Sequence, residues 1–433
     1  MGRRTALFWE NRYESGVPRR ERRSGEFFAY IPDPLQGLPL RVSAETGQAV
    51  ARAERAVQRL GGARMHDLAL VSRFLLRSEA IASSFIEGIA PNPKNIALAE
   101  LSESDEPVLG LSEAAQQVAR NMTIVRTATQ ALASVDQLTP GDLEELQIAL
   151  VQERPDLQGV RIQQNWVGGS SYHPLEAAHV PPPAALLDDL MRDLTDYLSG
   201  AAHSPIIQAA LAHAQFETIH PFPDGNGRVG RALIHTVLTR RGLTPDAVLP
   251  VSLILATRRD EYVAGLTAFR FEGEPDSPEG VAGINRWVTV FADAVGHAAE
   301  QALVLERELT QLRNEWQSML EEGRRRAGRV RAPRRTSAVL MVLEGLPGTP
   351  ILTPATVVRM HGTSLSGAAS ALSELAEYGI LSTVSIGRGN RAYMSPDVLN
   401  LITVRERALA SPAFDTAVSP PSWKVPALPP EGR

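Results

Sequence analysis

The sequence of 433 residues contains no cysteine and only two lysines, Lys94 and Lys424. Without cysteine the chain cannot form disulfides, zinc–thiolate sites or a thiol nucleophile. Arginine carries nearly all the positive charge, and the net charge of −5 is too mild to indicate a polyanion as the main partner. No apolar run approaches the roughly 20 residues of a membrane span, and none follows Arg3 and Arg4 as a signal peptide requires. We therefore expect a cytoplasmic protein with no membrane segment.

One short run combines most of the residue types that an active site needs. Residues 220–231 read His-Pro-Phe-Pro-Asp-Gly-Asn-Gly-Arg-Val-Gly-Arg, between two segments whose apolar residues recur at helical spacing. The run is therefore predicted to be a loop joining two helices. Gly225 and Gly227 let backbone N–H groups approach an anion closely, and Arg228 begins the next helix. We expect this loop to hold a polyphosphate, with His220 beside it as general base.

Three other interpretations of this run are disfavoured by its surroundings. Residues 225–230 match the GxGxxG pattern of dinucleotide folds, with Asp246 at about the right distance, but no hydrophobic strand precedes them. An EF-hand loop beginning at Asp224 would need acids where Arg228 and His235 stand. A hairpin turn would need alternating strands on both sides, which the sequence does not show.

The run resembles the motif of Fic proteins, His-Pro-Phe-x-Asp/Glu-Gly-Asn-Gly-Arg-x-x-Arg, and it matches every specified position, with Pro223 at the free one. Such a long ordered motif rarely matches by chance. The resemblance covers about residues 75–300. It implies a mainly α fold, with a helical core and a small β-hairpin flap. Most family members transfer AMP from ATP to a hydroxyl of a target protein, so the resemblance implies a protein adenylyltransferase.

The resemblance also implies a role for each motif residue. His220 would take the proton from a Ser, Thr or Tyr hydroxyl, which then attacks the α-phosphate of ATP. Asp224 would hold a Mg²⁺ ion that bridges phosphate oxygens. The family's phosphotransferase branch departs from the motif at glycine and arginine positions, whereas this chain does not, which favours nucleotidyl transfer. Phosphate contacts are expected from Gly225, Asn226, Gly227, Arg228 and Arg231.

A second element lies upstream, at residues 83–88, which read Ser-Ser-Phe-Ile-Glu-Gly. Taken alone, it is typical of a helix turn with Gly88 as C-cap. Beside the loop, it resembles the inhibitory helix motif of Fic proteins, Ser/Thr-x-x-x-Glu-Gly/Asn, with Ser83, Glu87 and Gly88 matching. The resemblance implies that Glu87 pairs with Arg231 in the space of the γ-phosphate, as an intramolecular brake. In some relatives this glutamate helps a water to remove AMP, so an enzyme in which removal predominates stays open.

A third element, residues 159–169 followed by residues 179–183, resembles the flap hairpin that precedes the Fic core helices. Its β-branched and aromatic residues predict strands, and its Gly-Gly pair predicts a turn. In the family this edge takes up the target segment by strand addition. The alternative is an ordinary surface hairpin. The expected docking residues are Val160, Arg161, Ile162, Trp166 and Gly168.

The order of patterns along residues 336–403 resembles a winged helix-turn-helix domain. Three helices and a strand pair are expected, with the helix from Ser364 facing a DNA major groove and Arg388 and Arg391 in the wing. That helix face carries no Lys or Arg, although strong DNA binding needs several phosphate contacts. A docking or dimer role is therefore the alternative to DNA binding.

The expected organisation combines these elements. We expect an N-terminal arm and helices at residues 1–100, followed by the Fic core at residues 101–322. A basic linker (323–335), the winged-helix-like domain (336–403) and a flexible tail (404–433) would follow. The favoured function is AMP transfer to a target protein, or to the chain itself, by a homodimer that Glu87 restrains. The alternative is a DNA-bound regulator whose core senses nucleotide. The intact loop favours the enzyme, because a pure sensor has no evident use for His220. Neither the target nor the nucleotide base can be read from the sequence.

Overall fold

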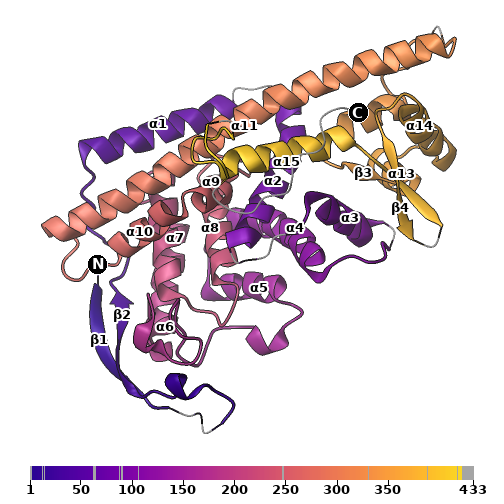
Figure 1. Ribbon diagram of the computed structural model, residues 1–433. Coiled ribbons are helices and arrows are strands. Elements are labelled where there is room, and N and C mark those ends of the chain that lie inside the picture. The colour runs from indigo at the N-terminus through magenta and orange to yellow at the C-terminus, as the bar shows by residue number, and fades with distance from the viewer. Residues whose placement is uncertain are drawn as a thin grey trace. The chain divides into compact units, whose positions relative to one another are not determined.

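Helices dominate the structure, a computed structural model that describes residues 2–421 except 12, 14, 62–64, 87, 89–90, 106, 246–247, 330, 388 and 417 (Figure 1). The mainly α fold class that we predicted is confirmed. Within this described part of the chain, no helix combines the length and the hydropathy needed to cross a membrane.

The chain folds into two compact units, and each is assembled from segments that are far apart in the sequence. The first unit consists of Met1–Arg55, Thr127–Pro245 and Arg259–Gly296. The second consists of Ala56–Arg126, Asp246–Arg258 and His297–Arg433. The run at residues 220–231 belongs to the first unit, and the motif at residues 83–88 belongs to the second. Helices that contribute to both are α1 (Ala44–Gly61), α4 (Glu113–Ser134) and the 49-residue α11 (Pro278–Arg326).

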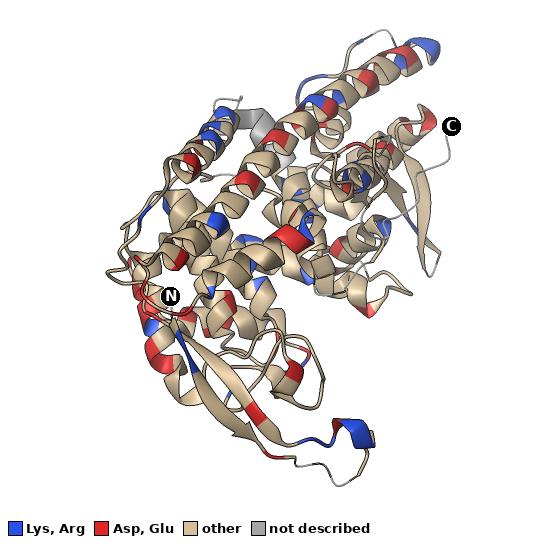
Figure 2. Cartoon of the chain, turned by 60° about the vertical axis from the view of Figure 1, so that its left-hand side comes forward, with Lys and Arg blue, Asp and Glu red and all other residues tan. Residues whose placement is uncertain are grey.

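The first unit begins with a β-hairpin where the sequence predicted an arm. Strands β1 (Gly2–Trp9) and β2 (Gly25–Pro32) pair antiparallel, and a bridge joins Gly2 to Gly273. The Arg- and Pro-rich composition of the region hid two short stretches rich in aromatic and apolar residues, which suit strands. Arg3 and Arg4 lie in β1, and further arginines gather at the far end of the hairpin, around the short 3₁₀ helix Arg19–Glu21 (Figure 2).

Helix α7 forms the centre of the first unit. It is apolar on every side, and nearly all of its residues are buried, as expected of a helix enclosed by others. Pro205 stands in its first turn, where a missing N–H costs nothing. The helices of this unit besides α7 (Pro205–Ile219) are α5 (Pro140–Leu150), α6 (Leu187–Ser199), α8 (Asn226–Arg240) and α10 (Arg259–Phe269).

Helices α7 and α8 pack closely because Gly230 has no side chain. A Cβ at that position would lie 2.7 Å from Glu217 Oε1 and 3.1 Å from a Phe216 ring carbon. The fully buried His213 fills the same contact: its Nδ1–H donates to the Gly230 carbonyl (2.9 Å), and its Nε2 accepts from the Tyr262 hydroxyl (3.0 Å). Burial lowers the pKa of His213 to about 3, so the ring stays neutral.

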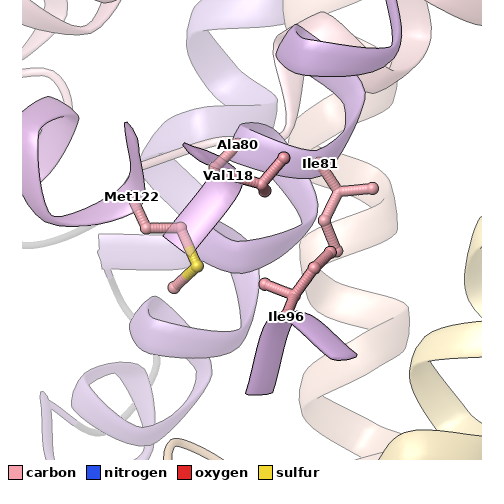
Figure 3. Close-up of a cluster of buried hydrophobic side chains, with 5 residues drawn as sticks. All are labelled: Ala80, Ile81, Ile96, Val118 and Met122. Atoms are coloured by element: carbon pink, nitrogen blue, oxygen red, sulfur yellow. The ribbon is translucent and has the colours of Figure 1, made fainter. Parts of the chain in front are cut away.

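The second unit is organised around α2 (Met65–Ile86) and α9 (Val251–Thr257). The carboxylate of Glu79 accepts hydrogen bonds from the backbone N–H and the hydroxyl of Ser252, in the first turn of α9. An acid at that end of a helix is favoured by the helix dipole. Apolar side chains of α2, α3 (Pro93–Ser104) and α4 form a buried cluster of Ala80, Ile81, Ile96, Val118 and Met122 (Figure 3).

The C-terminal part of the second unit has the predicted order of three helices and a strand pair. The helices are α12 (Ala338–Gly345), α13 (Pro354–His361) and α14 (Leu365–Glu377). An additional short strand, β3 (Ile351–Leu352), joins β4 (Ser382–Gly387) and β5 (Asn390–Met394) in the order β3-β5-β4. Arg388 of the expected wing lies outside the described residues. Helix α15 (Pro396–Ala410) runs past residue 404, where the sequence predicted a flexible tail.

The burial of His213 predicts how stability changes in acid. Its folded-state pKa of about 3 lies below the ordinary value of 6.5, so below pH 6.5 the unfolded chain takes up a proton that the folded chain does not. Stability from this group is therefore complete above pH 6.5 and is lost as the pH falls towards 3, by about 1.4 kcal/mol per pH unit. We expect urea unfolding between pH 7 and 5 to show a shallower pH dependence in His213→Gln. The control His297→Gln, at a side chain that is 32% exposed, should keep the wild-type slope; equal slopes in all three proteins would contradict the prediction.

Candidate active site

The candidate active site is the turn that connects α7 to α8, and His220 stands at its first position. Helix α7 ends at Ile219, and the His220 N–H still bonds to the Phe216 carbonyl (2.9 Å). The backbone of His220 is left-handed (φ 46°, ψ 60°), a conformation that only one other non-glycine residue adopts in the described part of the chain. Such backbone strain is tolerated where the surroundings impose it, and it concentrates at functional sites.

Two amide side chains hold the ring of His220. The Nδ2 atoms of Asn165 and Asn226 lie 3.1 and 3.3 Å from its Nδ1. Both amides also donate to the Phe222 carbonyl, at 3.0 and 2.7 Å, so their orientation follows from bonds that only N–H groups can make. Nδ1 of His220 must therefore accept, and this leaves the ring neutral with its proton on Nε2. Asn165 lies within the segment that was predicted as a flap, but it was not predicted as a site residue.

Arg161 was predicted to dock a target, but it is buried and holds the turn instead. Its side chain donates to the backbone carbonyls of His220 (3.0 Å) and Gln163 (3.1 Å), and to that of Pro182. Arg161 is 4% exposed, and burial lowers its pKa to about 10. Its fork of donors satisfies carbonyls that the turn leaves without partners. An arginine in a strand-like pattern gives no sequence signal of this role.

The predicted strands of the flap are absent. Residues 160–166 follow an irregular path with bends, and a single isolated bridge joins Val167 to His179. Ile162 is 89% exposed, whereas Trp166 packs edge-on against Trp9 and donates to the Ser170 carbonyl. Val160 is half-buried, and Gly168 has a positive φ of 76° as its predicted turn position requires. The exposed edge of this segment is therefore centred on Ile162.

The side chain of Asn226 stabilises the turn through hydrogen bonds within it. Its side chain accepts from the Phe222 N–H (2.9 Å) and donates to the Phe222 carbonyl, so one amide pairs with both backbone groups of one residue. Phe222 is fully buried and its ring centroid lies 6.0 Å from that of Phe216. Asn226 was predicted to contact phosphate, but in this structure its hydrogen bonds stabilise the turn.

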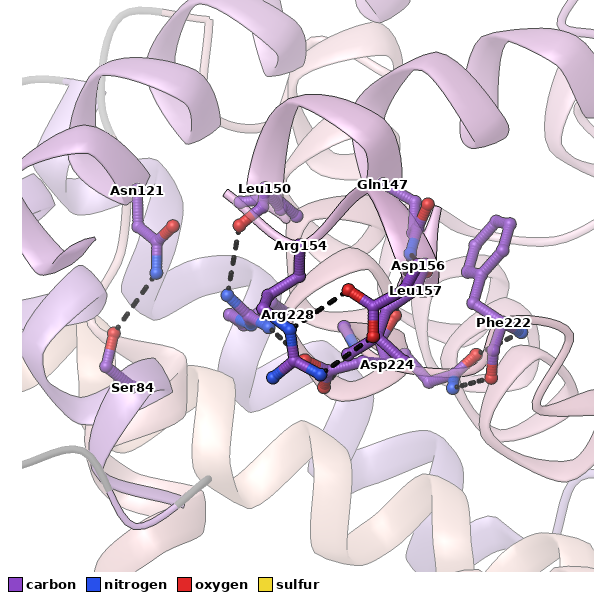
Figure 4. Close-up of polar contacts among 12 residues, drawn as sticks. Ser84, Asn121, Gln147, Leu150, Arg154, Asp156, Leu157, Phe222, Asp224 and Arg228 are labelled. Carbon is purple, nitrogen blue, oxygen red and sulfur yellow. Dashed lines mark hydrogen bonds and ion pairs between the residues drawn. The ribbon is translucent and has the colours of Figure 1, made fainter. Parts of the chain in front are cut away.

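Asp224 and Arg228 form an ion pair at the mouth of the turn (Figure 4). Their Oδ2 and Nη2 atoms are 3.4 Å apart, the carboxylate is 48% exposed, and the guanidinium is 5% exposed. Arg228 also donates to the Leu150 carbonyl (3.2 Å), and Asp224 Oδ1 accepts from the Gly225 N–H (2.7 Å). A pair this long and this solvated contributes little stability and is easily exchanged.

Gln147 of α5 ties the turn to the segment that follows α5. Its amide donates to the carbonyls of Leu157 (2.8 Å) and Asp224 (3.0 Å) and accepts from the Gly159 N–H (3.0 Å). The side chain is fully buried, so each of these bonds replaces water that the backbone groups lost. Gln147 was not predicted as a site residue, because nothing in its local sequence distinguishes it from a helix surface glutamine.

Helix α8 begins at the end of the turn, where an anion would be favoured. Gly225 is its N-cap with φ 85°, and the helix starts at Asn226. The first N–H groups of a helix have no partner within it, and they carry the positive end of its dipole. Gly227 and Arg231, both predicted to contact phosphate, lie in the first two turns; Gly227 is half-buried and Arg231 is buried.

The motif at residues 83–88 lies at the end of α2, which stops at Ile86. Ser83 is buried, and Gly88 has φ 83° with its N–H bonded to the Phe85 carbonyl (2.9 Å). Gly88 therefore has the left-handed backbone that the predicted glycine C-cap requires. Glu87, the residue predicted to act as a brake, lies outside the described residues.

Comparison with known proteins places the turn in a family. Residues 137–238 match the Fic/DOC family. A "Probable protein adenylyltransferase" of Aquifex aeolicus is 41% identical over 87 residues, which are 20% of this chain and 25% of that protein. A "Protein adenylyltransferase Fic" of Drosophila willistoni is 36% identical over 119 residues, 26% of this chain and 22% of that protein. The chain thus spans about a quarter of the length of these relatives.

The fold has a relative among solved structures. The crystal structure of a Fic family protein from Desulfovibrio desulfuricans G20 superposes with a TM-score of 0.51, and the match covers 83% of this chain and 98% of that one. At 21% identity this likeness concerns the fold alone. Residues 137–238, with the complete motif at the turn between α7 and α8, are thus similar to the Fic/DOC family.

Proposed function

We propose that this chain is a protein adenylyltransferase, which moves AMP from ATP to a hydroxyl of a target protein. The observation that carries the proposal is the position of His220: a neutral imidazole, held by two amides, directly before a helix N-terminus that favours anions. A base next to an anion site is what attack of a hydroxyl on a phosphate requires. The names of the relatives, and the match of the motif, support the same reaction.

In the proposed reaction His220 acts as general base. The lone pair at Nδ1, which the amides of Asn165 and Asn226 contact, would leave those contacts and take the proton of a Ser, Thr or Tyr hydroxyl while the hydroxyl oxygen bonds to the α-phosphorus of ATP. The bond from the α-phosphorus to the bridging oxygen breaks, and pyrophosphate leaves. The products are the AMP ester of the target and pyrophosphate, and His220 holds the proton that the hydroxyl lost.

The turn and the start of α8 would hold the phosphates. The N–H groups from Gly225 onwards point out of the helix start, and Arg228 exchanges its long contact with Asp224 for a phosphate oxygen. Asp224 would hold the Mg²⁺ ion, because a half-exposed carboxylate beside phosphates is a usual magnesium setting. When bound, the ion would neutralise charge on the phosphates. No cluster of three or more metal-ligating side chains occurs in the described part of the chain, so Asp224 would be its protein ligand.

The target and the brake are proposed on different grounds. The target segment would lie along residues 160–166, where Ile162 is 89% exposed, close in sequence to the arginine that holds the His220 carbonyl. The brake is proposed from the motif at residues 83–88 alone, with Glu87 competing with the γ-phosphate for Arg231. Without Glu87, ATP would adopt the pose that aligns its α-phosphate.

Replacement of Glu87 tests the brake. We expect Glu87→Gly to increase AMP transfer, including self-modification, because the competing carboxylate is gone. The measurement is intact-protein mass spectrometry after incubation with ATP and Mg²⁺, which resolves an AMP-sized addition. Glu79→Gln removes a carboxylate of α2 that precedes Glu87 in the sequence; it is the control and should leave transfer low. Equal transfer in wild type and Glu87→Gly would show that Glu87 does not restrain the enzyme.

Replacement of His220 tests the base. In a Glu87→Gly background, we expect His220→Ala to slow AMP transfer by about 10²–10⁴-fold, the usual contribution of general-base catalysis. His203→Ala is the matched control, because that half-buried histidine contacts Tyr197 and not the turn. Undiminished transfer in His220→Ala would overturn the role of this residue. A phosphate-sized addition, in place of AMP, would move the reaction to phosphotransfer.

Replacement of Asn165 tests whether it positions and tunes His220. A carboxylate at this position would lie about as close to Nδ1 as the amide does, and an opposite charge at that distance raises the pKa of a histidine by about 1–3 units. His220 works as a base only when neutral, so the acidic limb of the pH–rate profile should move to higher pH in Asn165→Asp. Gln164→Glu adds the same charge one residue away, at a side chain bonded to the Pro181 carbonyl, and should move the limb less. Identical pH–rate profiles for wild type, Asn165→Asp and Gln164→Glu would show that the contact between Asn165 and His220 does not determine the pKa of the base.

A further inference from the structure

A second cavity of the first unit is lined by none of residues 220–231. It has a volume of about 370 Å³, within the range of small-molecule sites. Three elements enclose it: the hairpin β1–β2, the segment at residues 174–180 and helix α10 with the residue that follows it. The cavity has both a polar and an apolar side, and these two sides define the kind of ligand that fits it.

The polar side is dominated by Arg270. Its Nε donates to the Thr218 hydroxyl (3.1 Å) and its Nη2 donates to the Glu217 carbonyl (3.2 Å), and both acceptors are neutral. Among the described residues, no carboxylate lies within ion-pair distance of this guanidinium. Burial lowers the pKa of Arg270, and the more distant charge of Glu217 only partly offsets this effect. The side chain nevertheless keeps some accessible surface, since it faces the cavity.

Neither Arg4 nor Glu26, the other two charged side chains that line the cavity, forms an ion pair with Arg270. Arg4 is paired with Glu272 at 3.2 Å, and both side chains are 56% exposed. Glu26 is exposed, at the hairpin, and forms no ion pair with either arginine among the described residues. A buried guanidinium that remains charged at any physiological pH, without a paired anion, is an unusual and costly arrangement in a protein interior.

Two further polar groups of the cavity wall are neutral. His179 donates through Nε2 to the Thr218 carbonyl (3.0 Å), and burial holds its pKa well below the ordinary value. The Tyr30 hydroxyl donates to the Phe271 carbonyl (2.7 Å), and burial raises its pKa. Neither group can supply the missing negative charge.

The apolar side comes from the hairpin and from the segment opposite to it. Phe27 and Val180 are buried in one cluster with Leu175 packed against it, and the ring of Phe28 is 54% exposed. These side chains offer an aromatic or aliphatic body a surface away from water. A bare inorganic ion would leave that surface unused.

We propose that this cavity binds a small organic anion, a carboxylate or phosphate monoester with an apolar body, and that Arg270 recognises its charge. The proposal goes beyond AMP transfer and does not depend on it. The bound anion supplies a negative charge at ion-pair distance, whereas Glu217 acts on Arg270 only from further away. Arg270 and His179 both hold backbone or side-chain atoms of residues 217–218, in the last turn of α7 before His220. A ligand in the cavity therefore touches the side chains that support the start of the turn.

Isothermal titration calorimetry of the full chain with phenyl phosphate tests the proposal. We expect saturable binding of phenyl phosphate, and binding of phenol that is at least about tenfold weaker, because phenol lacks the charge that Arg270 recognises. Arg270→Gln keeps a donor but removes the charge and should weaken phenyl phosphate by at least about tenfold. Thr267→Trp fills the cavity from α10 without changing Arg270 and should abolish binding.

The controls separate this cavity from the turn at residues 220–231. Arg259→Gln, at an exposed arginine of the same helix, should bind phenyl phosphate as wild type does. Thermal melting curves are recorded for each variant, so that binding is compared only among folded proteins. The proposal is overturned if wild type does not bind phenyl phosphate at millimolar concentration, if Arg270→Gln and Thr267→Trp bind as tightly as wild type, or if Arg228→Gln loses binding as strongly as they do.

Discussion

The turn between α7 and α8 depends on a single constraint: its backbone polar groups are shielded from water and must find partners within the protein. Side chains from α5, from residues 161–165 and from the start of α8 itself provide them. Arg161 bonds to the His220 carbonyl, Asn165 and Asn226 bond to that of Phe222, and Gln147 bonds to that of Asp224. An unpaired buried carbonyl costs about 1–3 kcal/mol, so the turn can adopt its shape only when all of these side chains are in place. The left-handed conformation of His220 is sustained by the same bonds.

These bonds also explain why many residues of the motif fix the shape of the turn and do not take part in the proposed reaction. Asn226 pairs with both backbone groups of Phe222, and Gly230 lets α8 approach α7 closely enough for His213 to bridge them. The base of the proposed reaction is thereby held by groups that do not themselves react. A site supported in this way can leave Asp224 half-exposed, because the loop does not rely on that carboxylate for its shape.

The sequence predicted the helical fold and the loop, and it did so for identifiable reasons. The motif is contiguous, and the helices on either side have regular apolar spacing, so α7 lies almost exactly where it was expected. Helix α8 begins at Asn226, two residues before the predicted start at Arg228, because Asn226 and Gly227 form its first turn without helix-favouring side chains. The strands β1 and β2 were not predicted, because the region around them is rich in arginine. The flap strands were predicted from β-branched and aromatic residues, but Ile162 is exposed and Trp166 packs against Trp9, and neither lies in a strand. Gln147 and Asn165 could not have been found, since their partners are distant in sequence.

The bridge between Gly2 and Gly273 has a consequence for the order in which the chain becomes ordered. A ribosome releases the N-terminus first, yet the outer edge of β1 acquires its last partner only when residue 273 has emerged. Until then, the hairpin exposes unpaired backbone groups and the aromatic side chains of β2. Closing so long a loop makes this a late step of folding. The hairpin, which is synthesised well before residue 273, must therefore wait for this partner, and it is a natural point at which a chaperone would engage the nascent chain.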